Sequence, residues 1–168
     1  MFKILFLLLS VVAASPQPDS FKEYRQMVDS APFIVINKDS LTLTLCSESG
    51  EVLRHYGVSV AKKFGNKERR GDGRTPEGVF KINQVLKSDY LSHDFGDGKG
   101  PVKGAYGPWF LRLSTPGFID IGIHGTHKPE SIGTRDTEGC IRLRNEDILD
   151  LKQLVKVGTP VIILPDSK

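Results

Sequence analysis

The chain has 168 residues, of which 39% are hydrophobic and 26% charged. This length and composition are typical of one globular domain with a real core and exclude a disordered or low-complexity chain. The net charge is +3 and the pI about 8.8. The lysines and arginines are scattered, however, and no basic tract indicates a nucleic-acid partner.

The first residues have the layout of a secretory signal peptide. Lys3 supplies a positive charge, an apolar run broken only by Ser10 follows, and small residues lead to Ala14. The run is too short to span a bilayer, and no cysteine follows it to carry a lipid anchor. A short buried helix or a membrane anchor is the alternative.

These features predict a signal peptide at 1–14, a polar linker at 15–31 and a folded domain at 32–168. We expect the protein to be secreted across the cytoplasmic membrane into the periplasm or cell wall. No stable membrane insertion is expected after signal removal, because no other segment is apolar enough to cross a bilayer.

Most of the expected elements are strands, because short apolar runs and runs with period two recur along the chain. They are expected at 33–36, 41–45, 52–60, 78–82, 109–113, 118–123 and 161–164. Short turns join the first three strands, which predicts an antiparallel meander. The fold class is therefore mainly β.

One helix is well signalled near the C-terminus. Asn145 is the expected N-cap, and two acidic residues follow it where they favour the positive end of a helix. Apolar residues recur on one face from Ile148 to Val155. Gly158 and Pro160 are expected to stop the helix.

One short segment gathers three reactive side chains, His124, His127 and Cys140. A cysteine nucleophile needs a neighbouring base, and histidine can take and return protons near neutrality. His124 ends an apolar strand, and the backbone carbonyl of Gly125 is free to orient an imidazole. Gly139 leaves room for a substrate and leaves amides free to stabilise an oxyanion.

Other interpretations of this segment remain open from the residues alone. Cys140 and the two histidines could bind a metal ion, but their spacing does not match the usual zinc pairs. Cys140 could also be a buried small hydrophobe. In an oxidising compartment it could form the single possible bridge with Cys46, which would exclude a nucleophilic role.

Several ordered motifs resemble L,D-transpeptidase catalytic domains of the YkuD type (ErfK/YbiS/YcfS/YnhG-like). The signature lies in Ile-His-Gly-Thr at 123–126 and Thr-Glu-Gly-Cys-Ile-Arg-Leu at 137–143. Gly-Asp-Gly-Arg-Thr-Pro-Glu-Gly-Val-Phe at 71–80 is similar to the family's Gly-Asp-x-x-Thr-Pro-x-Gly stretch. The similarity extends over 33–164.

The resemblance implies a β-sandwich-like fold and a cysteine acyltransferase that acts on peptidoglycan stem peptides without a metal or cofactor. By position, Cys140 is the nucleophile and His124 its base. The Gly125 carbonyl orients the imidazole. We expect amides near Gly139 and Cys140 to form the oxyanion hole. Cys46 is then an unpaired strand residue, and a monomer is expected.

The implied reaction begins with attack of the thiolate on the carbonyl of diaminopimelate, the third stem residue, with release of D-Ala. Transfer to an amine gives a 3–3 crosslink or a related exchange product. The alternatives are an L,D-carboxypeptidase, a hydrolase of wall linkages, or a catalytically silent wall-binding module. The sequence does not identify the acyl acceptor.

One position departs from the family pattern, since Glu138 stands where a histidine usually precedes Gly-Cys. A carboxylate there would raise the pKa of the Cys140 thiol by like-charge repulsion, or would bind the ammonium group of diaminopimelate. Arg142, two residues beyond Cys140 on an expected strand, offers a fork for stem carboxylates. Trp109 could line the cleft or belong to the core.

Overall fold

The computed structural model describes residues 25, 26, 28 and 32–167. The predicted signal peptide at 1–14 and most of the predicted linker at 15–31 lie outside the described residues. Among the described helices, none has the length and apolar character needed to cross a membrane.

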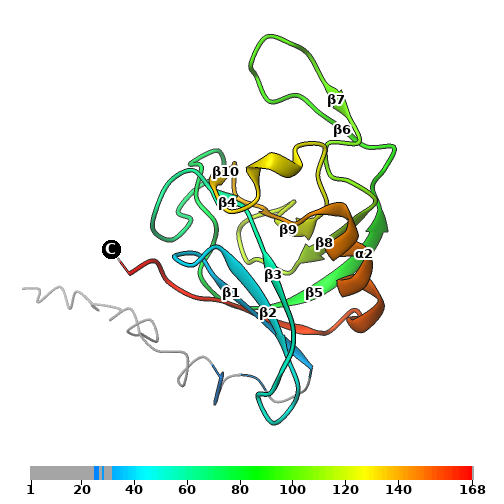
Figure 1. The fold of residues 1–168 in the computed structure, drawn as a ribbon. Coiled ribbons are helices and arrows are strands. Elements are labelled where there is room, and N and C mark those ends of the chain that lie inside the picture. Colours follow the sequence, from blue (N-terminus) through cyan, green and yellow to red (C-terminus); the bar gives the residue numbers. More distant parts are fainter. Residues whose placement is uncertain (1–24, 27, 29–31, 168) are drawn as a thin grey trace, which may run out of the picture.

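Eight strands form one sheet (Figure 1). In spatial order they are β11 (Ile141–Arg142), β9 (Gly122–His124), β8 (Trp109–Leu113), β5 (Gly78–Lys87), β12 (Pro160–Ile163), β1 (Phe33–Asn37), β2 (Thr42–Cys46) and β3 (Val52–Gly57). The predicted antiparallel meander of β1, β2 and β3 is confirmed, and β12 lies parallel to β1.

Two short strand pairs lie outside this sheet. β4 (Val60–Ala61) pairs with β10 (Arg135–Thr137), and β6 (Ser92–His93) pairs with β7 (Val102–Lys103). The expected strand at 52–60 is thus divided between β3 and β4. The β6–β7 hairpin projects from one end of the domain (Figure 1).

Strand β5 belongs to both halves of the sheet. Residues Gly78 to Lys81 pair with β12, whereas Ile82 to Lys87 pair with β8, and the register shifts between Ile82 and Gln84. Such an irregularity bends a strand and increases its twist. The mainly β, sandwich-like prediction is therefore confirmed as one curled sheet.

The main core is built by alternation along the strands. In β1 and β2, every second side chain points to the same face of the sheet, and Ile34, Ile36, Leu43 and Leu45 are fully buried there. Residues from β5, β8, β9, β12 and the C-terminal helix complete this cluster. Each fully buried aliphatic side chain contributes roughly 1.5–3 kcal/mol to stability.

The opposite face of β1 and β2 carries a smaller cluster of Val28, Phe33, Cys46 and Ile162. Cys46 is buried in this cluster, and both cysteines of the chain are free thiols in the structure. Cys46 therefore packs as a small apolar residue.

The predicted helix is confirmed as α2 (Asn145–Leu154), which packs against β8 and β9 with Ile148 and Leu151 buried. Its predicted N-cap is wrong by one residue, because Asn145 is the first residue inside the helix. The Asn145 side chain instead accepts a hydrogen bond from the Thr126 amide at 2.7 Å. The Asn145 side chain therefore binds a distant backbone amide and not an amide of its own helix.

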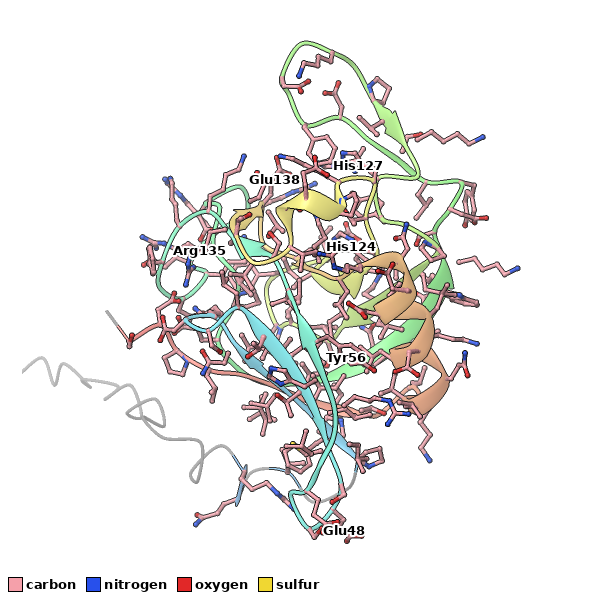
Figure 2. All side chains as sticks on the ribbon, viewed as in Figure 1. Glu48, Tyr56, His124, His127, Arg135 and Glu138 are labelled. Carbon is pink, nitrogen blue, oxygen red and sulfur yellow. The ribbon has the colours of Figure 1, made fainter. Side chains whose placement is uncertain are left out.

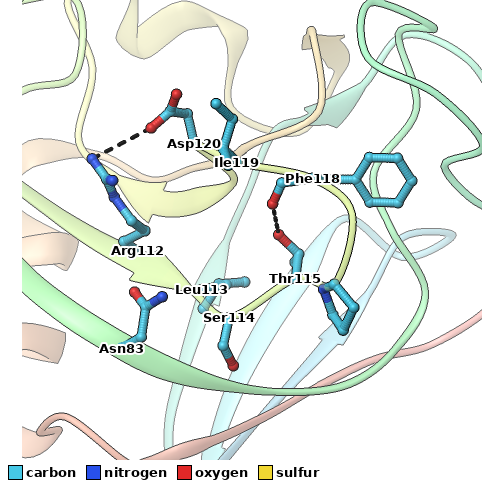
Figure 3. A pocket seen from close by; sticks show the side chains of 9 residues that line it. Asn83, Arg112, Leu113, Ser114, Thr115, Phe118, Ile119 and Asp120 are labelled. Atoms are coloured by element: carbon cyan, nitrogen blue, oxygen red, sulfur yellow. Dashed lines mark hydrogen bonds and ion pairs between the residues drawn. The ribbon is translucent and has the colours of Figure 1, made fainter.

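The strand predicted at 118–123 is wrong for its first four residues, since β9 begins only at Gly122. Asp120 has a φ of 65°, a left-handed conformation that a strand does not contain. The preceding residues form a loop in which the Thr115 hydroxyl donates to the Phe118 carbonyl at 2.6 Å. This loop and Arg112 line a cavity of about 360 Å³ (Figure 3).

Candidate active site

A second cavity, of about 460 Å³, contains the residues that the sequence singled out. The titratable side chains that line it are Lys67, Arg70, His93, Tyr106, Asp120, His124, Glu138, Cys140 and Arg142. Within the described part of the chain, no group of three or more His, Cys, Asp or Glu residues is arranged to hold a metal ion.

Parallel pairing of β9 with β11 brings the two halves of the signature together. Ile141 lies opposite Ile123, and Arg142 lies opposite His124. The two isoleucines are fully buried in the core, so the alternate residues face away from it. Cys140, one step before Ile141, thus lies on the same side as His124 and Arg142, which is the side of the cavity.

Three contacts fix the His124 ring. Its Nδ1 lies 2.6 Å from the Gly125 carbonyl oxygen. The ring stacks on Phe110 with centroids 5.4 Å apart and an interplanar angle of 6°, and Tyr106 meets it edge-on at 5.0 Å. Because a carbonyl can only accept, Nδ1 carries the proton and Nε2 keeps a free lone pair.

Burial keeps this imidazole neutral. It lowers the pKa of His124 to about 3, against an opposing effect of the bond to the Gly125 carbonyl and with a smaller contribution from the Arg142 cation. A neutral imidazole with a free Nε2 is the state in which histidine accepts a proton.

The carbonyl that orients His124 is itself fixed by the start of α2. A Cβ at Gly125 would lie 2.4 Å from Asn145 Oδ1 and 2.9 Å from Pro108 Cδ, so only glycine fits. Asn145 Oδ1 also accepts from the next amide, that of Thr126. The sequence identified Gly125, but Asn145 carried only a local capping signal.

Cys140 is half-buried, and its Sγ donates to the Asp120 carbonyl at 3.3 Å. Burial raises the pKa of the thiol to about 11. The Gly122 amide opposes this effect, Asp120 adds to it, and Lys67 and Arg142 oppose it. The thiol is therefore protonated at rest, and among the described residues no hydrogen bond joins it to His124.

Gly139 is required by its surroundings, since a Cβ there would lie 3.0 Å from Ile121 Cδ1 and 3.1 Å from the Arg74 carbonyl oxygen. Its amide, expected to be free for an oxyanion, donates instead to Thr137 Oγ1 at 3.3 Å. The Thr137 hydroxyl in turn donates to the Cys140 carbonyl at 2.6 Å.

Glu138 turns toward the β6–β7 hairpin. Its Oε2 accepts from His93 Nε2 at 3.1 Å, and His93 Nδ1 lies 2.9 Å from the Tyr106 hydroxyl. Figure 2 shows Glu138 and His127 at the end of the domain from which the hairpin projects. His93 had no partner in the sequence, because the pairing joins residues 45 positions apart.

The carboxylate that raises the pKa of Cys140 is that of Asp120. Glu138 was the residue expected to have this effect from the sequence.

Burial, together with the charges of Cys140 and Glu138, raises the pKa of Tyr106 to about 12, so its hydroxyl stays protonated.

Arg142 is a buried cation in the cavity wall. Its Nη1 donates to Ser131 Oγ at 2.7 Å and to Asp136 Oδ2 at 2.9 Å, and only 3% of the residue is exposed. Within the described residues, its buried Nε has no hydrogen-bond partner. The guanidinium is thus largely committed to the protein, which leaves less of it for a substrate carboxylate than the sequence suggested.

Trp109 and His127 do not line the cavity. Trp109 packs against the main core on β8, and Lys152 of α2 lies over its ring at 4.5 Å. Of the two roles expected for Trp109, the structure therefore favours the core. His127 lies at the surface with its ring 5.3 Å from that of Phe95.

Two residues of the glycine-rich loop between β4 and β5 (residues 62–77) complete the site, and the sequence gave no role to either. Lys67 lines the cavity, and its Nζ donates to Asp72 Oδ1 at 2.7 Å. Burial acts to raise the pKa of Asp72, but bonds from Lys67 and three backbone amides outweigh it and hold the pKa far below its ordinary range.

Comparison with known proteins identifies the same family along nearly the whole described chain. A family model described as the L,D-transpeptidase catalytic domain (YkuD) matches residues 31–163. The putative L,D-transpeptidase YqjB of Bacillus subtilis is 31% identical over 139 residues, which cover 82% of this chain and 73% of that protein. The putative L,D-transpeptidase YkuD of Bacillus licheniformis is 45% identical over 138 residues, 82% of this chain and 68% of that protein.

Solved structures have the same fold. An L,D-transpeptidase from Mycobacterium smegmatis superposes with a TM-score of 0.57 at 25% identity, over 79% of this chain and 58% of that one. L,D-transpeptidase 3 from Mycobacterium tuberculosis, with a faropenem-derived adduct, gives a TM-score of 0.60 at 18% identity, over 80% of this chain and 60% of that one. The present chain thus spans about three-fifths of these longer chains.

Proposed function

The chain belongs to the family of L,D-transpeptidase catalytic domains, and on that premise we propose that it is an exported cysteine L,D-transpeptidase acting on peptidoglycan tetrapeptide stems. The observation that carries the proposal is the placement of Cys140 and a neutral His124 on one face of the β9–β11 pair. The free Nε2 of that histidine makes it the base.

In the first half-reaction, His124 Nε2 takes the proton of the Cys140 thiol as Sγ attacks the carbonyl of diaminopimelate. The tetrahedral intermediate collapses with cleavage of the bond to the terminal D-Ala. His124 returns its proton to the departing amine, and the acyl group remains on Cys140 as a thioester.

In the second half-reaction, the amine of another stem attacks the thioester. His124 takes a proton from this amine and gives it to the departing sulfur, which restores the thiol. One peptide bond is broken and one is formed, D-Ala is released, and the product is a 3–3 crosslink. Water in place of the amine would give a tripeptide.

The oxyanion of each intermediate needs backbone donors. We assign the Cys140 amide to this role, because it has no hydrogen-bond partner among the described residues. The Gly139 amide is a second donor only if its 3.3 Å bond to the Thr137 hydroxyl is exchanged for one to the substrate.

Both partners of the proton transfer are neutral in the free enzyme, with pKa values of about 11 for the thiol and about 3 for the imidazole. A stable thiolate–imidazolium pair is therefore unfavourable before substrate binds. We infer that the proton moves as the substrate carbonyl approaches, so that negative charge passes directly from sulfur to the oxyanion.

The experiment that tests the function is mass spectrometry of purified tetrapeptide muropeptides incubated with residues 15–168, beside the Cys140→Ala variant. A dimer lacking one D-Ala, absent with the variant, is the expected product. Tripeptide alone would identify water as the acceptor. No product from either protein would contradict the proposal and leave a wall-binding module.

Export is tested separately by N-terminal sequencing of the protein recovered outside the cytoplasmic membrane. Cleavage after Ala14 predicts that the mature chain starts at Ser15. An intact Met1 on the recovered protein would contradict the signal peptide.

A further inference from the structure

We propose that Lys67 is a positioning residue that acts through Cys140: its ammonium group, fixed by Asp72 beside Gly139, stabilises the Cys140 thiolate as it forms. The proposal rests on the proposed function, because a thiolate matters only if Cys140 is the nucleophile. Lys67 lies in the glycine-rich loop, far in sequence from the signature that carries His124 and Cys140.

The location of the ammonium group is the first support. Lys67 is only 7% exposed, and it lines the cavity that contains Cys140. A Cβ at Gly139 would lie 3.6 Å from Lys67 Nζ. The charge therefore lies beside the residue that precedes the nucleophile.

The rigidity of the charge is the second support. Lys67 Nζ donates to Asp72 Oδ1 at 2.7 Å and to the Arg74 carbonyl at 3.3 Å. The carboxylate of Asp72 also accepts from the amides of Glu68 and Arg69, at 2.8 and 3.1 Å. An ammonium group has three donors, so one remains without a hydrogen-bond partner among the described residues.

The shape of the loop explains its sequence. Gly71 and Gly73 have φ angles of 75° and 69°, which L-residues with side chains rarely adopt. These glycines curve the backbone around Asp72 so that the amides on both sides can reach its carboxylate. The Gly-Asp-Gly segment therefore fixes the Asp72 carboxylate that binds the Lys67 ammonium group.

No other charge around Cys140 stabilises its thiolate as strongly as Lys67. Asp120 and Glu138 are negative, Asp120 being paired with Arg112 at 3.4 Å and Glu138 with His93 at 3.1 Å. The remaining titratable groups on the cavity wall are Arg70, Tyr106, His124 and Arg142. Arg142 is paired with Asp136 as Lys67 is with Asp72, but of the two cations that lower the pKa of Cys140, Lys67 has the larger effect.

The test compares Lys67→Met with Lys63→Met, which removes the same charge from an exposed position of the same loop. The alkylation rate of Cys140 by iodoacetamide is measured from pH 7 to 10 by mass mapping of its peptide. Loss of Lys67 is expected to slow alkylation about tenfold at each pH, because an opposite charge at close range shifts a pKa by one unit or more. Lys63→Met is expected to match the wild type.

A folded Lys67→Met protein with the wild-type alkylation profile would overturn the proposal. Lys67→Met leaves the buried Asp72 carboxylate unpaired, which destabilises a fold. The double variant Lys67→Met/Asp72→Asn removes both charges, and slower alkylation is still expected because Asp72 does not line the cavity. A double variant that is alkylated as fast as the wild type would contradict the role of Lys67.

The muropeptide assay on the wild-type protein separates this proposal from the proposed function. Crosslinked product together with an unchanged alkylation profile in both variants would reject the role of Lys67 alone. No product from the wild type, with slower alkylation in the variants, would reject the transpeptidase function and keep the effect of Lys67 on the thiol.

Discussion

Asp120 holds a backbone conformation that few residues accept, and its two contacts show what the conformation achieves. Its carbonyl accepts a hydrogen bond from the Cys140 thiol at 3.3 Å. Its carboxylate pairs with Arg112 at 3.4 Å (Figure 3). The left-handed turn thus directs one group to the nucleophile and the other away from the core. Its charge, however, opposes formation of the thiolate.

Replacing Asp120 with Asn should therefore make Cys140 more reactive. Asn tolerates the left-handed conformation, and the substitution removes a charge that raises the pKa of the thiol. We expect alkylation at pH 8 to be about threefold faster, at a cost of less than about 1 kcal/mol for the exposed ion pair with Arg112. Asp89→Asn, at an exposed position, is the control; an unchanged or slower rate in Asp120→Asn would contradict the charge effect.

Glu138 remains a candidate for binding the ammonium group of diaminopimelate, because 58% of its side chain is exposed at the cavity. Glu138→Gln keeps the shape and removes the charge. We expect its KM to rise about tenfold for a stem with a free side-chain amine, since a charge-assisted hydrogen bond contributes roughly 1.5–3 kcal/mol. For a stem with that amine acetylated, KM should not change.

Equal KM values for Glu138→Gln and the wild type on the free-amine stem would rule out ammonium binding. Glu138→His, which restores the residue usual in the family, supplies a second measurement. A wild-type pH–rate profile and acceptor range in that variant would show that position 138 affects neither rate nor substrate.

At the scale of elements, one side chain of helix α2 bonds to the segment that follows strand β9. Asn145 binds the Thr126 amide and fills the space left by Gly125, so the first residue of the helix fixes the carbonyl that holds His124. Removing the side chain should therefore affect both stability and chemistry.

We expect Asn145→Ala to lose about 1–3 kcal/mol of stability, because the Thr126 amide loses its acceptor. It should also lower kcat about tenfold, because the Gly125–Thr126 peptide group, which carries the carbonyl that orients His124, loses the bond that fixes it. Urea unfolding and the muropeptide assay measure the two effects, with Glu146→Ala in the same turn as the control. A stability loss with an unchanged kcat would limit Asn145 to a structural role.

Local sequence patterns predicted the elements that pack on the core along one whole face. The alternation in β1 and β2 and the helical spacing around Ile148 and Leu151 were sufficient, because one face of each packs on the core. The second half of β5 was missed because Gln84 and Lys87 are exposed and its pairing with β8 is not local.

At the scale of the molecule, buried ion pairs tie the C-terminal segment to distant loops. The Asp166 carboxylate accepts from Lys38 at 2.8 Å and from Arg135, and Lys38 also pairs with Glu77. The side chains of Lys38 and Asp166 are each 1% exposed. Gly65 of the glycine-rich loop donates to the same carboxylate at 2.6 Å.

The shifted pKa values of His124 and Asp166 predict that the protein loses stability in acid. Burial lowers the pKa of His124 to about 3, so the unfolded chain binds its proton first, and stability falls as the pH drops from about 6.5 to 3. Burial opposes ionisation of Asp166, but its bonds to Lys38, Gly65 and Arg135 lower its pKa. Its contribution is present above about pH 4 and is lost as the pH falls through the lowered value.

Urea unfolding at pH 7, 5 and 3 measures this dependence. Asp166→Asn should cost about 3–5 kcal/mol at pH 7, because it leaves Arg135 without its carboxylate and Lys38 with Glu77 alone, and it should show a smaller further loss at low pH. Asp89→Asn is the exposed control. Equal stability of Asp166→Asn and the wild type at pH 7 would show that the network contributes nothing.

How much of the site could be predicted follows from where its parts lie in the sequence. His124, Gly125 and Cys140 lie in one motif, and the resemblance to the family identified them together. Lys67 and His93 act through contacts with residues far away in the chain, and nothing in their own neighbourhood indicates those partners.

The protonated state of the resting thiol has a consequence for its resistance to oxidation. With a pKa of about 11, only about one Cys140 in 10⁴ is a thiolate at pH 7, and the thiolate is the form that peroxides oxidise. The resting thiol should therefore be oxidised slowly. Damage by oxidants should be concentrated in the moments of turnover, so an idle enzyme should outlast a working one.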